Sequence, residues 1–173
     1  MRALSVALLL AMTALSSAAF AQAPAAPTPP AAAAMKTFAS SAEIADLIAK
    51  AKAERKEGQA VVFKPILSLA PYRAGLEYRA GTAPAAVHEK DAELIMVLDG
   101  AGTITIGGTL VDEKRENPAN LSGSGIAGGT VQALTKGDVL IVPEKTPHQT
   151  HPAPGQVIVL MTLHVPRPAV GWR

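Results

Sequence analysis

Two stretches decide the fold of this chain: AVHEKDAELIMVLDG at residues 86–100 and GDVLIVPEKTPH at residues 137–148. Each joins a run rich in apolar and β-branched residues, which is typical of a strand with little water on either face, to a histidine or a carboxylate at the end of the run. Strands of this kind seldom carry such groups without a use for them. The two stretches therefore indicate a site built at the ends of buried strands.

The first stretch follows the spacing of a known motif. Four residues separate His88 from Glu93, and six separate Glu93 from Gly100. This spacing resembles the second half of the first motif of the cupin superfamily. The first half differs, because Ala86 stands where the family has its first histidine and Gly81 lies one residue closer to that position than usual.

The second stretch resembles the second cupin motif. Gly137, Pro143 and His148 fall at the positions of the family's glycine, proline and histidine. Lys145 replaces the middle glycine of the motif, and Pro152 stands where the family usually has an asparagine. The two motifs agree in order and separation, which makes the resemblance specific.

The resemblance covers roughly residues 60–166. It implies an all-β fold, the cupin-type double-stranded β-helix or jelly-roll barrel, and it implies a homodimer. It does not fix an activity, because cupins include dioxygenases, isomerases, decarboxylases, sugar-binding modules and seed storage proteins on one scaffold.

The apolar periodicity agrees with a barrel. From Val61 onward the pattern is strand-like, and glycine, proline and aspartate residues separate the runs. Eight short strands without helices between them predict a sandwich or a barrel, and closure leaves few exposed edges. The expected strands are 61–63, 66–69, 76–78, 92–98, 103–106, 130–134, 139–142 and 157–165.

One amino-terminal helix is predicted over about residues 41–56. Ser40 and Glu43 fit a capping box, in which each side chain bonds the other residue's amide. An apolar stripe follows at helical spacing, and Gly58 ends the helix. The stripe consists of Ile44, Leu47, Ile48 and Ala51. We expect this helix to pack against the barrel and to carry no chemistry.

The segment before the helix has the composition of an export signal and a linker. Residues 1–21 contain Arg2, a short apolar run and an A-x-A site, which predicts a secretory signal peptide; a retained membrane anchor is the alternative. Residues 22–35 are rich in alanine and proline and predict a linker. The chain has no cysteine, so a periplasmic or secreted location would involve no disulfide.

The remaining residues, 36–173, predict a single cupin domain. The formal net charge is +2 and the basic residues are dispersed along the chain. Nothing in this distribution indicates a nucleic-acid partner, or a membrane partner once the signal is removed.

A polar insertion occupies residues 110–129. It contains a literal G-x-G-x-x-G at Gly123, Gly125 and Gly128. A dinucleotide site needs this pattern between a strand and a helix, and here a loop precedes it while β-like residues follow it. We therefore expect a surface loop, with a mobile lid over the barrel mouth as the alternative.

If the cupin topology holds, His88, Glu93 and His148 converge inside the barrel. Two imidazoles and a carboxylate form a ligand set that suits Fe(II) and also accepts Mn, Ni, Co, Cu or Zn. Ala86 removes one ligand from the family's usual four. The consequence is either an additional open coordination position or a site without useful metal affinity.

Two other histidines are candidates for the missing ligand. His164 lies in the last predicted strand and is the candidate fourth ligand; the alternative is a histidine satisfied by a carbonyl group. His151 precedes a proline- and glycine-rich segment, which predicts a turn exposed to solvent.

Two functions remain open. The first is an exported metal-dependent enzyme, of dioxygenase or isomerase type, acting on a small oxygenated substrate. The second is a non-catalytic module that holds a small ligand in a barrel whose metal site is degenerate or absent. Lys90, at the rim, is a further candidate for contact with an anionic substrate.

Overall fold

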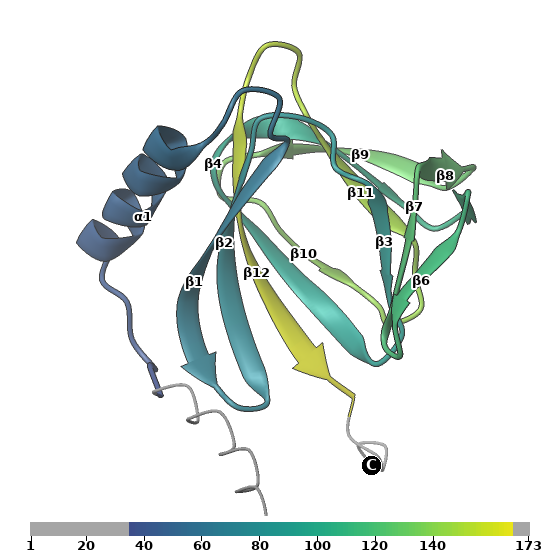
Figure 1. Ribbon diagram of the computed structural model, residues 1–173, viewed down its shortest axis with the longest axis horizontal. Helices are drawn as coiled ribbons and strands as arrows, with labels where there is room; N and C mark the ends of the chain where they lie inside the picture. The colour runs from purple at the N-terminus through teal and green to yellow at the C-terminus, as the bar shows by residue number, and fades with distance from the viewer. Residues whose placement is uncertain (1–34, 168–173) are drawn as a thin grey trace, which may run out of the picture. The chain divides into compact units, whose positions relative to one another are not determined.

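The computed structural model describes residues 35–167. The predicted signal peptide and all but the last residue of the predicted linker lie outside the described residues. Within them, the chain forms one helix and twelve strands (Figure 1). These are α1 (Ser41–Glu54), β1 (Val61–Leu69), β2 (Tyr72–Arg79), β3 (Ala85–His88), β4 (Asp91–Ile106), β5 (Thr109–Val111), β6 (Lys114–Asn117), β7 (Asn120–Gly123), β8 (Gly125–Ala127), β9 (Thr130–Thr135), β10 (Val139–Val142), β11 (His148–Pro152) and β12 (Ile158–Pro166).

The strands form a curled antiparallel sheet. Hydrogen-bonded neighbours run in the order β1-β2-β12-β4-β11-β3-β7-β6, and β9 and β10 also pair with β4. Figure 1 shows the sheet curving into a barrel, with α1 beside β1 and β2. The prediction of an all-β, cupin-type barrel with one amino-terminal helix is confirmed. Within residues 35–167, no helix has the length and apolar character needed to cross a membrane.

Strand β4 joins the two halves of the barrel. Its first half pairs with β10 and β12, and its second half pairs with β9 and β11. The sequence predicted two strands here, 92–98 and 103–106, with a turn between them. That prediction was wrong, because Gly100 adopts a φ of +79° and lets one strand bend instead of ending.

Two other strand predictions also differ from the structure. Residues 61–63 and 66–69 form the single strand β1, in which a bulge between Pro65 and Leu67 interrupts the apolar pattern. Residues 110–129 form four short strands, β5 to β8, where a surface loop was expected. One of them, β7, pairs with β3 and places the insertion directly beside His88.

Alternation along the strands separates the two larger of three apolar clusters; the smallest consists of Ala85, Val87 and Leu110. The cluster inside the barrel is formed by side chains of β4, β9, β10 and β12; these are Ile95, Val97, Ile104, Leu134, Val142, Ile158 and Leu160. The second cluster lies between α1 and the outer face of β1, β2 and β12; its buried members are Ala51, Val62, Ile66, Ala74, Leu76, Tyr78 and Val159. The inward face of the same strands remains available for a polar site.

Helix α1 begins at its predicted cap. The Ser40 hydroxyl accepts a hydrogen bond from the amide of Glu43 at 3.2 Å. The Glu43 carboxylate binds the Lys36 ammonium and does not reach back to the cap. The predicted apolar stripe packs on the sheet, and Ala51 is fully buried. The helix ends at Glu54, two residues before the predicted end.

The bend in β4 gives a test of the fold. Both Gly100 and Gly137 have positive φ, +79° and +95°, but only at Gly100 would an added Cβ meet a backbone atom, the Val157 oxygen at 1.9 Å. We expect Gly137→Ala to lower the free energy of unfolding by about 1–2 kcal/mol, the usual cost of a left-handed residue. Gly100→Ala should cost more, on the order of 3 kcal/mol or above. Urea denaturation of both variants measures the difference, and equal costs would show that β4 does not need this close approach.

Candidate metal centre

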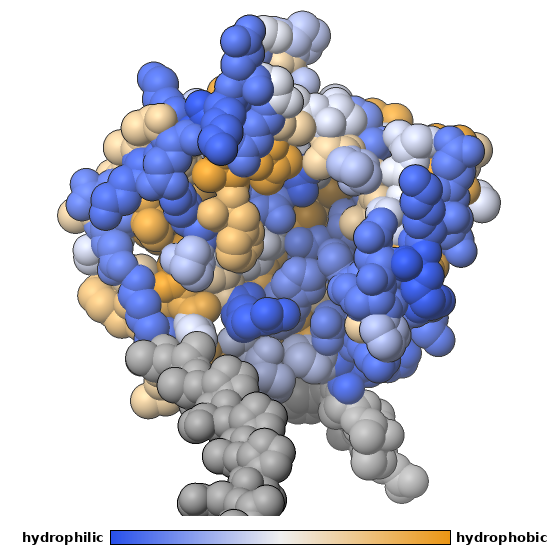
Figure 2. All heavy atoms as spheres, viewed as in Figure 1, coloured by the Kyte–Doolittle hydropathy of each residue, from blue (hydrophilic) through white to orange (hydrophobic). Residues whose placement is uncertain are grey.

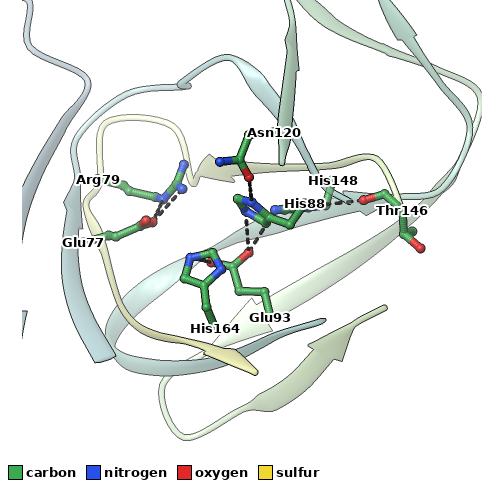
Figure 3. Close-up of polar contacts among 8 residues, drawn as sticks. All are labelled: Glu77, Arg79, His88, Glu93, Asn120, Thr146, His148 and His164. Carbon is green, nitrogen blue, oxygen red and sulfur yellow. Dashed lines mark hydrogen bonds and ion pairs between the residues drawn. The ribbon is translucent and has the colours of Figure 1, made fainter. Parts of the chain in front are cut away.

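Four side chains from four strands meet on the inward face of the barrel (Figure 3). His88 ends β3, Glu93 lies near the start of β4, His148 begins β11, and His164 lies near the end of β12. The register explains the convergence, because His164 pairs with Glu93 across β12 and β4, and His148 pairs with Ala86 across β11 and β3. Residues far apart in sequence therefore become neighbours.

The Glu93 carboxylate is the centre of the group. Its Oε2 lies 2.9 Å from His148 Nε2 and 3.6 Å from His88 Nε2, and its Oε1 lies 3.9 Å from His164 Nε2. Glu93 and His148 are buried, with 5% and 7% of their surface exposed. One ligand atom from each of His88, Glu93 and His148 lies within 4.8 Å of the others, an arrangement that could hold a metal ion.

The far side of two imidazole rings is fixed by hydrogen-bond acceptors. His88 Nδ1 lies 2.7 Å from Asn120 Oδ1, and His148 Nδ1 lies 3.1 Å from the Thr146 carbonyl oxygen. The Asn120 amide is itself oriented, since its Nδ2 donates to Asn117 Oδ1 at 3.1 Å. Both Nδ1 atoms therefore carry a proton, and in the neutral rings both Nε2 atoms present a lone pair toward Glu93.

This arrangement brings acceptors together. A neutral His148 would place the Nε2 lone pair 2.9 Å from a carboxylate oxygen, and two acceptors at that distance repel each other. A cation between them removes the repulsion. Either a proton on His148 Nε2 or a metal ion bound by the group can fill that role.

The surroundings change the pKa of two of these groups. Burial raises the pKa of the Glu93 carboxyl, but the hydrogen bond from His148 and the nearby imidazoles outweigh burial, and the pKa lies below its usual 4.5. Burial lowers the pKa of His164, against the opposing charge of Glu93. Burial therefore favours the neutral form of His164, which has a lone pair for a metal.

The structure places the two remaining candidate histidines differently. The His164 ring lies 4.5 Å from the His88 ring, centroid to centroid, and its Nε2 lies 3.9 Å from Glu93 Oε1. His151 lies away from the group, where its Nδ1 contacts Thr82 Oγ1 at 3.1 Å. The expectation of a solvent-exposed turn at His151 was wrong, because this half-buried residue continues β11.

Sequence reasoning missed two features that position the ligands. Asn120 lies in the insertion, 32 residues from its partner His88, and no spacing rule links them. Lys145 has a φ of +61°, the conformation for which the motif normally has glycine, and its amide donates to the His88 carbonyl at 2.7 Å. The motif's glycine at this position could have predicted the positive φ of Lys145.

The pKa of Glu93 gives a test that needs no metal. A carboxyl whose pKa is lowered by folding stabilises the protein above its unfolded pKa, and this contribution is lost as the pH falls below 4.5. We expect the metal-free wild type to lose more stability than Glu93→Gln between about pH 5 and about pH 3 in urea denaturation. Glu57→Gln, an exposed acid, serves as the control and should follow the wild type. A Glu93→Gln curve parallel to the wild type would contradict the geometry described.

No protein-family model and no curated protein matches the sequence. Solved structures with similar folds include the cupin domain of Schizosaccharomyces pombe Cnp3, at 15% identity, 63% coverage of each chain and a TM-score of 0.47. A cupin superfamily protein from Desulfitobacterium hafniense has 16% identity and a TM-score of 0.47, over 66% of this chain and 84% of that one.

A third similar structure is the hydroquinone 1,2-dioxygenase PnpCD, in complex with Cd²⁺ and 4-hydroxybenzonitrile. It has 14% identity and a TM-score of 0.46, over 58% of this chain and 61% of that one. At these identities the likenesses carry no conclusion about activity. By its own strand order and by the place of its two motifs in the barrel, the protein has the cupin fold.

Proposed function

We propose that this protein binds a divalent transition metal through His88, Glu93 and His148, with His164 as the fourth ligand. One observation carries the proposal: the Nε2 atoms of the imidazoles converge on a buried carboxylate while Asn120 and Thr146 occupy the opposite nitrogens of two rings. Three imidazoles and one carboxylate suit Fe, Mn, Ni, Cu or Zn. His164 would thereby replace the ligand missing at Ala86.

The reaction class we propose is that of a metal-dependent enzyme, of dioxygenase or isomerase type, on a small oxygenated substrate. A bound transition metal supplies a Lewis acid or a redox centre for such chemistry. The chain's own contribution is to hold the imidazoles in one orientation, to exclude water around Glu93, and to keep His164 neutral. We also propose that the protein acts after export, in the periplasm or outside the cell, and as a homodimer.

A second function has its own support. Among the described residues, no buried side-chain nitrogen or oxygen lacks a hydrogen-bond partner. A protonated His148 satisfies Glu93 without any metal. The group could then be a structural feature of a barrel that binds a small ligand without catalysis.

Metal analysis separates the two functions. We expect wild-type protein, purified without chelators or nickel resin and reconstituted in turn with Fe, Mn, Ni, Cu and Zn, to retain one equivalent of at least one metal. His88→Ala and His148→Ala should lose it, because each removes a ligand that no neighbouring group replaces. His151→Ala is the matched control and should retain the metal, since that ring lies outside the group. Absence of metal from the wild type after every reconstitution would favour the binding module.

Asn120 provides a finer test of the same site. Removal of the Asn120 amide leaves the four candidate ligands in place. It takes away the oxygen, 2.7 Å from His88 Nδ1, that sets the tautomer of the ring. We expect Asn120→Ala to weaken metal affinity by about 10- to 100-fold, as for other partners of metal-bound histidines. Asn120→Asp should retain affinity, because a carboxylate oxygen accepts the same hydrogen bond. Competition with a chromogenic chelator measures both, and unchanged affinity in Asn120→Ala would exclude a positioning role.

A further inference from the structure

A cavity of about 310 Å³ adjoins the candidate metal centre. It lies on the inward face of β1, β2 and β12, and His164 is part of both its wall and the histidine group. Figure 2 shows hydrophilic side chains gathered at this open face of the barrel, with hydrophobic ones beside them over β1 and β2. Its volume is at the lower end of the range for small-molecule sites.

The cavity wall includes Arg73, an exposed arginine that has no acidic partner among residues 35–167. Arg73 pairs with His164 across β2 and β12, so the two side chains lie on the same face. Within residues 35–167, Arg73 makes no salt bridge and no side-chain hydrogen bond. The other charged residue of the wall is Glu77. Its Oε2 accepts a hydrogen bond from Arg79 Nε at 2.7 Å and lies 2.6 Å from Arg79 Nη2 (Figure 3). Arg73 is therefore the charged side chain of the wall that has no ion-pair partner among the described residues.

An aromatic ring forms another part of the wall. The Phe63 side chain lies over Gly75, where an added Cβ would be 2.1 Å from the ring. The close approach keeps the ring in the cavity wall, although 59% of Phe63 is exposed. With Pro65 it supplies an apolar surface beside Arg73. Such a surface suits the carbon skeleton of a ligand, and it is costly to leave exposed without one.

We propose that this cavity is the substrate site and that it binds a small organic carboxylate, with the Arg73 guanidinium on the carboxylate and the Phe63 ring against the carbon skeleton. The inference deepens the proposed function and rests on it. The planar fork of an arginine matches the two oxygens of a carboxylate. A single arginine beside an apolar wall favours this ligand over a phosphate, which proteins bind with several donors at once. The substrate would then extend from Arg73 past His164 toward Glu93.

Lys90, which the sequence suggested for contact with an anion, does not line this cavity. It lies in the turn between β3 and β4. Arg73 is the better candidate to bind the carboxylate. Unlike Lys90, it forms a cross-strand pair with His164 and lies on the same face, and its planar guanidinium matches the two carboxylate oxygens.

Ligand titration followed by NMR tests the proposal. The probes are benzoate, succinate and glycolate, each compared with a neutral counterpart: benzyl alcohol, succinamide and ethylene glycol. We expect at least one carboxylate to shift the signals of Thr162, His164 and Gly75, and its neutral counterpart to bind more weakly. Arg73→Gln should weaken the binding of that carboxylate by about 10- to 100-fold, the usual value of a charge-assisted pair. The affinity of Arg73→Lys for the same carboxylate should lie between those of the wild type and Arg73→Gln. Arg55→Gln, which removes a half-buried arginine at the C-cap of α1 that does not line the cavity, is the control and should bind as the wild type does.

The titration is run on metal-free and on metal-loaded protein, so that failures can be told apart. Loss of carboxylate binding in Arg73→Gln without metal supports the carboxylate site even if the metal proposal fails. Metal content measured on the same Arg73→Gln sample should equal that of the wild type. Equal carboxylate affinity in the wild type and Arg73→Gln, or no binding of any carboxylate at the cavity, would overturn the inference.

Discussion

The buried carboxylate of Glu93 is the group on which the inner face of this barrel depends. A negative charge with so little exposure is costly unless cations or donors surround it. Here imidazoles from three other strands, β3, β11 and β12, surround it, and a cation shared between them and the carboxylate, either a proton on His148 or a metal ion, would meet this requirement. The neighbouring strand faces carry ordinary apolar packing, which confines the polar chemistry to one end of the interior.

The two motifs allowed much of this to be predicted from sequence. His88, Glu93 and His148 could be brought together on paper because the order and separation of the two motifs resemble those of the cupin family, and that resemblance implies their convergence inside the barrel. The departures from the motifs were also informative. Lys145 occupies a glycine position and adopts the backbone conformation for which that glycine is used, so the substitution changed the side chain and left the turn intact. Ala86 removes one histidine of the motif, and His164, from the last strand, lies within 4.5 Å of the His88 ring and so adds a third imidazole to the group.

Other parts of the structure could not be predicted, for physical reasons. The Asp99-Gly100 pair normally signals a turn, but here the pairing of β4 with four different strands outweighs that local preference and the strand continues. The insertion at 110–129 is polar and rich in glycine, so it has no apolar periodicity to reveal its strands. β5 and β8 pair with each other, whereas β6 pairs with β7 and β7 pairs with the edge of β3. The contact of Asn120 with His88 follows from that pairing and from nothing local in the sequence.

The main chain links the two motif segments independently of their side chains. The Lys145 amide bonds the His88 carbonyl, the Gly107 amide bonds the Pro147 carbonyl at 2.8 Å, and β11 pairs with both β3 and β4. These bonds hold the backbone of the histidine group without any ion, unlike the small domains that fold only around their metal. Occupancy would then follow the abundance of each ion in the surrounding compartment, and exchange of one metal for another would proceed without refolding.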